Sequence, residues 1–140
     1  MANEFARNIQ DASLNPATFA LPSSASSSTT SAVIDFGTDT FKNGLVELDL
    51  AIPALSTTIA PDTRTVTAII ETSTTSNFAA VDATIFSKIL TGAGGAGIGA
   101  QSGLRCRLPS NCARYVRAKI TFGASTTDGS AVSATFTPRF

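Results

Sequence analysis

The chain has 140 residues and a formal net charge of zero, and only 14% of its residues are charged, below the roughly 25% typical of soluble proteins. This length suits a single domain, and the balanced charge excludes the strongly basic signature of many nucleic-acid-binding proteins. The sequence starts without the basic and apolar segments of a secretory signal. No run of about 20 apolar residues is present, so we expect no membrane insertion.

Residues 1–31 differ in composition from the rest of the chain. Two prolines and then a run of Ser and Thr, NPATFALPSSASSSTTS, occupy residues 15–31 without helical or strand periodicity. This composition predicts an extended N-terminal arm ahead of a single domain at residues 32–140. Apolar side chains recur along the arm, and either a neighbouring subunit or the chain's own domain could bind them. They are Phe5, Ile9, Leu14, Phe19 and Leu21.

From residue 32 onward, short alternating segments predict β strands. VELDLAI (46–52) and YVRAKITF (115–122) place apolar residues on one face and polar residues on the other. The other predicted strands are SAVIDF (31–36), RTVTAIIET (64–72), VDATIFSKIL (81–90), GLRCRL (103–108) and AVSATFTPRF (131–140). Clusters of turn-forming residues separate them. About seven or eight short strands with long connections predict an all-β sandwich of jelly-roll or Greek-key type.

The segment TGAGGAGIGA has glycines at the G-x-G-x-x-G spacing of a dinucleotide-binding loop, at Gly92, Gly94 and Gly97. Such a loop needs a helix directly behind it and an acidic residue about 20 positions later. No full helix fits before the next turn, and no Asp or Glu follows until Asp128. We therefore interpret the segment as a flexible spacer between two strands, and we expect no nucleotide cofactor.

Cys106 and Cys112 bracket RLPSN, a sequence that predicts a hairpin turn. A disulfide across this turn is geometrically possible, and two small, reduced and buried thiols are the alternative. A metal site would need further ligands, and the chain contains no His, so we expect no bound metal.

Charge is segregated along the sequence. Residues 1–82 contain nine acidic and three basic residues, whereas residues 83–127 contain six basic residues and no acidic one. One interpretation is complementary pairing between copies of the chain or with a partner. The alternative is cross-strand pairing within one sheet. The basic residues that we expect at such a contact are Arg105, Arg107, Arg114, Arg117 and Lys119.

The sequence offers little for catalysis. Because His is absent, the commonest general base is missing and Ser-His-Asp and Cys-His sites are impossible. Glu47 and Asp49 share one face of a predicted strand, but without a Trp platform to hold a sugar they are expected to be surface charges. We expect no enzymatic activity, no cofactor and no small-molecule substrate.

The last third of the sequence carries the most recognisable pattern. LPSNCARYVRAKITFGASTTDGSAVSATFTPRF (108–140) resembles the C-terminal half of the jelly-roll cement, or decoration, proteins of tailed-phage capsids. The shared features are a Leu-Pro turn, Arg-Tyr-Val-Arg at the start of a long strand, a Thr/Gly turn and a last strand rich in small and apolar residues. Upstream, SAVIDFGTDT and VTAIIETSTTSNF resemble earlier strands of that family, so the resemblance covers roughly residues 32–140.

The resemblance implies a structural virion protein on the outer surface of a phage head, made in the bacterial host cytoplasm. Its partners would be the major capsid protein and itself, as a homotrimer that clamps neighbouring capsid subunits. No nucleic acid or membrane would be involved. Two alternatives remain open: a carbohydrate-binding or adhesive module, and another minor virion component such as a head-fibre base. A sugar-binding module should expose aromatic rings, whereas the chain has no Trp and a single Tyr, Tyr115.

Overall fold

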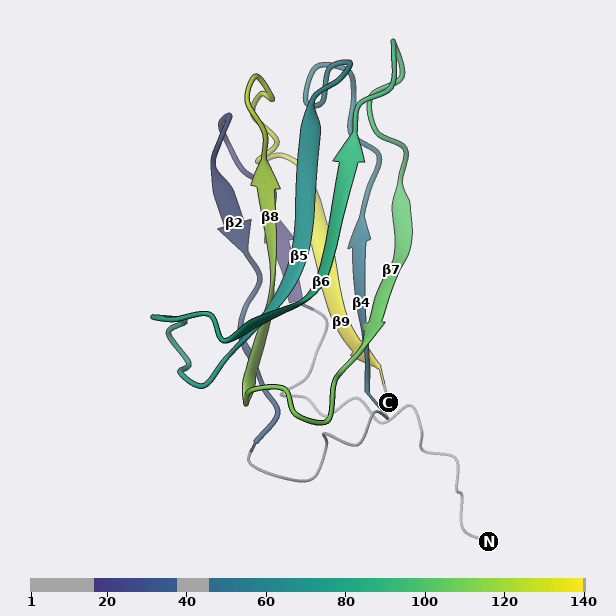
Figure 1. The fold of residues 1–140 in the computed structure, drawn as a ribbon. Coiled ribbons are helices and arrows are strands. Elements are labelled where there is room, and N and C mark those ends of the chain that lie inside the picture. Colours follow the sequence, from purple (N-terminus) through teal and green to yellow (C-terminus); the bar gives the residue numbers. More distant parts are fainter. Residues whose placement is uncertain (1–16, 38–45, 140) are drawn as a thin grey trace, which may run out of the picture.

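The protein folds as a β sandwich in the computed structural model, which describes residues 17–37 and 46–139 (Figure 1). These residues form nine β strands and no helix, and the strands make two antiparallel sheets. The prediction of an all-β sandwich is therefore confirmed. Within the described ranges, no helix is present that is long and apolar enough to cross a membrane.

Each sheet combines strands from both halves of the chain. The first sheet has the strand order β1-β9-β4-β7, and the second has the order β2-β8-β5-β6, with β3 also paired to β8. The strands of the first sheet are β1 (Ala17–Ala20), β9 (Ser133–Arg139), β4 (Glu47–Ile52) and β7 (Gln101–Arg107). Those of the second sheet are β2 (Ser28–Thr30), β3 (Ile34–Asp35), β8 (Tyr115–Phe122), β5 (Thr65–Ser73) and β6 (Ala83–Thr91).

β2 and β3 form one interrupted edge strand along β8. Thr30 lies opposite Lys119, and Ile34 lies opposite Val116. The edge strand therefore has one residue more than β8 between these two pairs, which is characteristic of a β bulge. Counted with β2 and β3 as one strand, the sandwich has eight strands, four in each sheet.

In this eight-strand count, the β5–β6 hairpin is the one connection between consecutive strands that stays within a sheet, and all the others cross between the sheets. The prediction of a hairpin turn between Cys106 and Cys112 is therefore wrong, because β7 belongs to the first sheet and β8 to the second. The turn itself is present, since the Cys112 amide donates to the Pro109 carbonyl oxygen at 3.1 Å. A turn signal does not tell which strands the turn joins.

The core lies between the two sheets and follows the alternation of the sequence. On β8, every second residue is fully buried, as predicted: Val116, Ala118, Ile120 and Phe122. Apolar residues of β5 lie beside them in the same sheet, and those of β4 and β9 face them from the first sheet, in one contiguous cluster. Fully burying one large apolar side chain contributes about 1.5–3 kcal/mol, so this alternation is the main source of stability.

Part of the predicted N-terminal arm belongs to the sandwich. β1 pairs with β9 and β2 pairs with β8, and Phe19 and Leu21 are 9% and 1% exposed in the chain's own core. The predicted boundary between arm and domain at residue 31 is thus corrected for residues 17–31, because very short edge strands rich in Ser and Thr resemble a linker in sequence. The predicted arm residues Phe5, Ile9 and Leu14 lie outside the described ranges.

The two ends of the sandwich differ in composition. The upper end in Figure 1 carries the loops at residues 21–27, 53–64, 92–100 and 123–132. These loops consist mainly of Ser, Thr, Gly, Ala and Pro, contain no aromatic residue, and carry charge only at Asp62, Arg64 and Asp128. The lower end carries the β5–β6 and β7–β8 loops and the end of β9 (Figure 1).

Candidate functional site

The glycine-rich segment lies at the upper end and is packed tightly against the β4–β5 loop. The amide of Leu55 donates to the carbonyl oxygen of Ile98 at 2.8 Å, and the reverse bond measures 2.9 Å. Gly97 is buried with a φ of +70°, and a Cβ there would overlap the carbonyl oxygen of Leu55. A Cβ at Gly92 would likewise overlap the carbonyl oxygen of Pro61. The segment connects two strands, β6 and β7, as predicted, but it is more than a spacer, because two of its glycines are required for close approach of the backbone.

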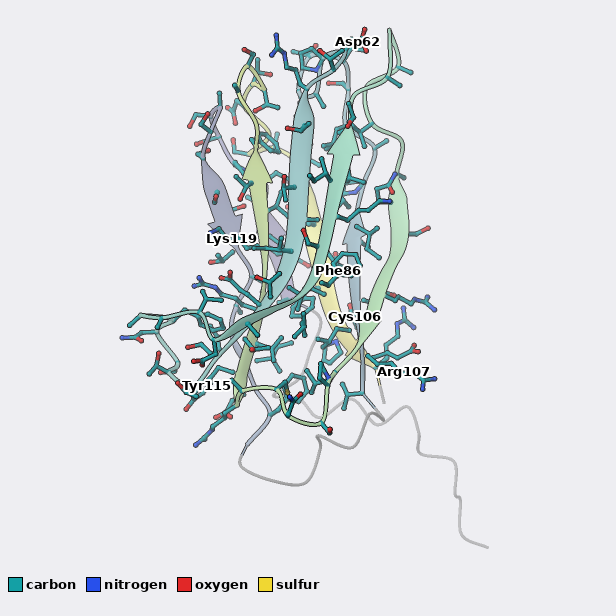
Figure 2. All side chains as sticks on the ribbon, viewed as in Figure 1. Asp62, Phe86, Cys106, Arg107, Tyr115 and Lys119 are labelled. Carbon is teal, nitrogen blue, oxygen red and sulfur yellow. The ribbon has the colours of Figure 1, made fainter. Side chains whose placement is uncertain are left out.

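The same segment is unsuited to a phosphate. β7 follows it instead of a helix, so the amide groups and dipole of a helix N-terminus are missing. The carboxylate of Asp62, labelled in Figure 2, is the nearest group to Gly94, with an oxygen 3.8 Å from where a Cβ would stand. A negative charge at this position repels an anion.

No disulfide joins Cys106 and Cys112. Cys106 is half-buried on β7 and packs against the core, and this burial raises the pKa of its thiol to about 11. Cys112 is buried in the β7–β8 loop. Among the residues that the structure describes, no three His, Cys, Asp or Glu side chains gather in a way that could hold a metal ion.

A group of five charged residues covers the outer face of the first sheet, and we call it the arginine cluster. On neighbouring strands, Glu47 lies opposite both Arg107 and Arg139, and Asp49 lies opposite Arg105. Asp49 Oδ2 accepts from Arg139 Nε at 3.1 Å and lies 3.4 Å from Arg105 Nε. Arg107 Nε is 3.8 Å from Glu47 Oε1, and Figure 2 shows its side chain extending outward beside the end of β7.

Asp49 differs from the surface charge that its strand position predicts. The residue is only 6% exposed, although it lies on the outer face. Its Oδ1 atom is buried and accepts no hydrogen bond. An unsatisfied buried acceptor costs about 1–3 kcal/mol, so this carboxylate is incompletely compensated by the chain's own groups.

Arg117 forms a second, covered cluster on the outer face of the second sheet. Its Nε donates to Glu71 Oε1 at 2.6 Å, and the two side chains are 19% and 3% exposed. The β5–β6 loop brings Phe78 over this pair, with its ring centre 4.0 Å from the guanidinium carbon. Phe78 itself is 7% exposed. Arg117 is therefore engaged within the chain.

Arg114 makes the most complete ion pair, at the lower end. Its Nε and Nη2 atoms each donate to a different oxygen of Asp35, both at 2.7 Å. The hydrogen bonds from Arg114 and from the Gly37 amide lower the pKa of Asp35 to about 2. The guanidinium carbon also lies 5.1 Å from the ring centre of Tyr115.

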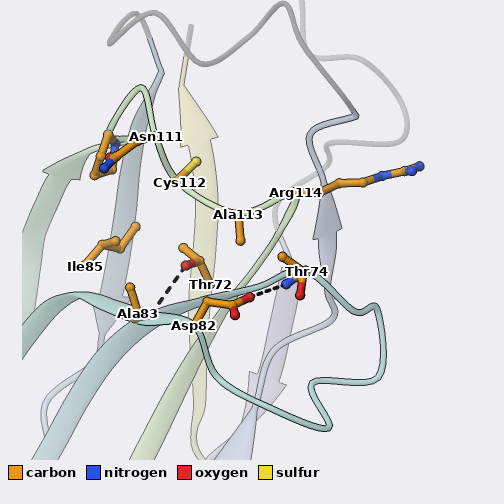
Figure 3. A pocket seen from close by; sticks show the side chains of 10 residues that line it. Thr72, Thr74, Asp82, Ala83, Ile85, Asn111, Cys112, Ala113 and Arg114 are labelled. Carbon is orange, nitrogen blue, oxygen red and sulfur yellow. Dashed lines mark hydrogen bonds between the residues drawn. The ribbon is translucent and has the colours of Figure 1, made fainter.

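A pocket of about 570 Å³ opens at the lower end between the β5–β6 and β7–β8 loops (Figure 3). Its lining mixes neutral polar and apolar side chains, and the two charged groups are already engaged: Asp82 accepts from the Thr74 amide, and Arg114 holds Asp35. The other lining residues are Thr72, Ala83, Ile85, Pro109, Asn111, Cys112 and Ala113. This volume suits a small ligand, but the lining brings no acid–base pair or activated nucleophile together.

The predicted contact residues do not converge on one site. Arg105 and Arg107 lie on the first sheet, whereas Arg114, Arg117 and Lys119 belong to β8 or its preceding loop on the second sheet. Arg105, Arg107 and Arg117 pair with carboxylates on neighbouring strands, so the alternative of cross-strand pairing within a sheet is confirmed for them. Arg114 pairs with Asp35 of β3 from the loop before β8. Whether they also contact a partner stays a prediction.

Arg139 was missed by sequence reasoning. It closes the arginine cluster from β9, where it lies opposite Glu47. The signal was available in the alternation of SATFTPR, which places Thr135, Thr137 and Arg139 on the face opposite Phe136. Arg139 lies beyond the basic stretch at residues 83–127, so the segregation of charge did not indicate a role for it.

Comparison with models of known protein families finds none that matches this chain. Comparison with curated proteins also finds no match.

Proposed function

We propose that the protein is a structural component of a phage head, a homotrimer that binds the outer surface and clamps neighbouring major capsid subunits. The proposal assigns it no enzymatic activity and no cofactor. The observation that carries it is the strand order, β1-β9-β4-β7 on β2-β8-β5-β6, in which all but one connection crosses between the sheets. This strand order and these crossing connections support a jelly roll, an architecture typical of viral capsid and lectin domains.

The composition of the upper end also supports assembly. Its four loops are poor in charge and rich in hydroxyl and small side chains, and depletion of charge is typical of the centre of protein interfaces. Such a surface can pack closely against another protein without burying unpaired ions.

The clamping of capsid subunits would result from the multivalency of the trimer. A trimer presents three copies of each weak contact, and once one contact forms, the others bind at high effective concentration. Binding to the assembled head alone also stabilises it by mass action. The apolar residues Phe5, Ile9 and Leu14 are proposed as additional contacts to a neighbouring subunit.

The competing function is a carbohydrate-binding or adhesive module. The jelly-roll architecture is shared with lectins, and the lower-end pocket has a suitable volume. Against it, the described aromatic rings are mostly in the core, and the two that are partly accessible, Phe86 and Tyr115, are only half-buried side chains and not exposed platforms. A glycan screen by thermal shift tests this module directly.

The proposal is tested by co-sedimentation with heads of the encoding phage that lack this protein. We expect saturable binding with a stoichiometry in multiples of three, and a trimer by light scattering on a sizing column. A variant without residues 1–16 keeps the described strands, so we expect it to fold and to bind more weakly. A monomer that leaves heads unbound and shifts its melting temperature with a glycan would replace this proposal by the alternative.

A further inference from the structure

In the arginine cluster on the first sheet, the positive groups are exposed to solvent and the central negative group is buried on the outer face. The side chains of Arg105, Arg139 and Arg107 are 52%, 55% and 77% exposed, whereas that of Asp49 is 8% exposed. Three guanidinium groups here face two carboxylates, so the face carries an excess of one positive charge. The excess is at the solvent side, where another molecule can reach it.

Arg105 and Arg139 have N–H donors that are not satisfied by the described residues. A guanidinium pairs best with a carboxylate as a fork, with two donors on two oxygens, as Arg114 does with Asp35. In the cluster, by contrast, Arg105 and Arg139 both contact the same oxygen, Asp49 Oδ2. The second oxygen, Oδ1, has no hydrogen bond.

This sharing has two consequences. It holds two like-charged groups next to each other on β7 and β9, which flank β4. It also leaves each guanidinium with N–H groups that have no acceptor among the described residues, because each arginine carries five donors. A further acceptor with negative charge would satisfy these donors and relieve the repulsion between the two arginines.

We propose that the arginine cluster binds carboxylate groups of an acidic protein segment. Separate carboxylates suit the site because they match the fork of each guanidinium. Because Glu47 is 41% exposed on the same face, the cluster has an excess of only one positive charge. This is too little for the many phosphate contacts on which nucleic-acid binding relies, which favours a protein segment over nucleic acid. The inference deepens the proposed function and rests on it only for the partner, which would be an acidic region of the capsid.

The test is an NMR titration of the isotope-labelled full chain with a hexaglutamate peptide at low salt. We expect saturable shifts at the Nε–H signals of Arg105, Arg107 and Arg139 and along β4, β7 and β9. The affinity should fall as salt is added, since salt screens exposed charges and shortens the Debye length, which is about 10 Å at 0.1 M ionic strength. Asp49→Asn keeps the shape of the side chain and removes its charge, so it should tighten peptide binding roughly fivefold.

Two further variants make the outcome decisive. Arg107→Gln removes an exposed charge from the cluster and should weaken binding severalfold without affecting folding. Arg64→Gln is the matched control, because Arg64 is an exposed arginine at the upper end that makes no ion pair with the residues the structure describes, and it should change nothing. The proposal is overturned if Asp49→Asn weakens binding, if Arg64→Gln acts like Arg107→Gln, or if the peptide produces no saturable shift.

Inorganic phosphate and a short DNA duplex serve as competing probes. Weaker binding of both than of hexaglutamate supports the carboxylate assignment, and tight DNA binding with no peptide binding overturns it. Because the titration uses no phage heads, its failure is separate from a failure of the proposed function. If the protein binds the peptide but not heads, the proposed carboxylate site is supported and the proposed capsid function is contradicted.

Discussion

Replacing Arg117 with Ala tests the interpretation that this arginine is a structural residue of the second sheet. Arg117 donates to Glu71 at 2.6 Å, and the two side chains are 19% and 3% exposed. The substitution leaves the Glu71 carboxylate buried without its partner. It also removes the contact of the guanidinium with Phe78 at 4.0 Å.

The expected loss is large on the scale of a domain this size. Removing one partner of a buried ion pair costs about 3–5 kcal/mol, and the contact with the aromatic ring adds about 0.5–2 kcal/mol. A single domain has about 5–15 kcal/mol in total. We therefore expect Arg117→Ala to lose about a quarter or more of the unfolding free energy and to lower the melting temperature by about 10 °C or more.

Urea unfolding followed by circular dichroism measures this loss, with Arg107→Ala as the matched control. The Arg107–Glu47 pair is 3.8 Å long and its side chains are 77% and 41% exposed, so its removal should cost less than about 0.5 kcal/mol. The double variant Arg117→Met with Glu71→Leu should recover most of the stability, because it leaves no buried charge. Equal small losses for Arg117→Ala and Arg107→Ala would refute the reasoning.

Four further substitutions are predicted from the structure. Gly97→Ala should lose at least about 2 kcal/mol in urea unfolding, because it combines a left-handed φ of +70° with backbone overlap, whereas Gly94→Ala has no neighbour within 3.8 Å and should be neutral within about 0.5 kcal/mol. Asp35 has a folded-state pKa lowered to about 2, so its contribution to stability is present above its unfolded value near 4 and lost as the pH falls toward 2. Arg114→Gln should remove this part of the acid sensitivity in thermal melts between pH 2 and 5. Thr29→Val should raise the unfolding free energy by about 1 kcal/mol, since Thr29 Oγ1 is buried without a hydrogen bond; a loss of similar size would contradict that account.

The sandwich class was predictable because alternation is a local property of the chain. β8 and β4 alternate cleanly in sequence, and the buried residues of β8 match the predicted face. β1 and β2 were not predictable in this way. They are four and three residues long, too short for a period to appear. Only their pairing with distant β9 and β8 makes them strands.

The candidate site was predicted only as a set of charges, because its geometry depends on register between distant segments. Sequence could mark Arg105 and Arg107 as basic residues on a polar strand face. It could not place Arg139 beside them, since that neighbour arrives from β9 on the far side of β4. Nor could it reveal that Asp49 is buried on an outer face. The arginines that contact Asp49 Oδ2 come from the two strands on either side of β4.

The central claim, that the protein stabilises a phage head by clamping its subunits, is tested most directly by the temperature at which heads release DNA. Heads that lack the protein are heated with and without the purified chain, and release is followed with a DNA-binding dye. The account predicts a higher release temperature that saturates at the binding stoichiometry and is reduced for the variant without residues 1–16. An unchanged release temperature at saturating protein would contradict it.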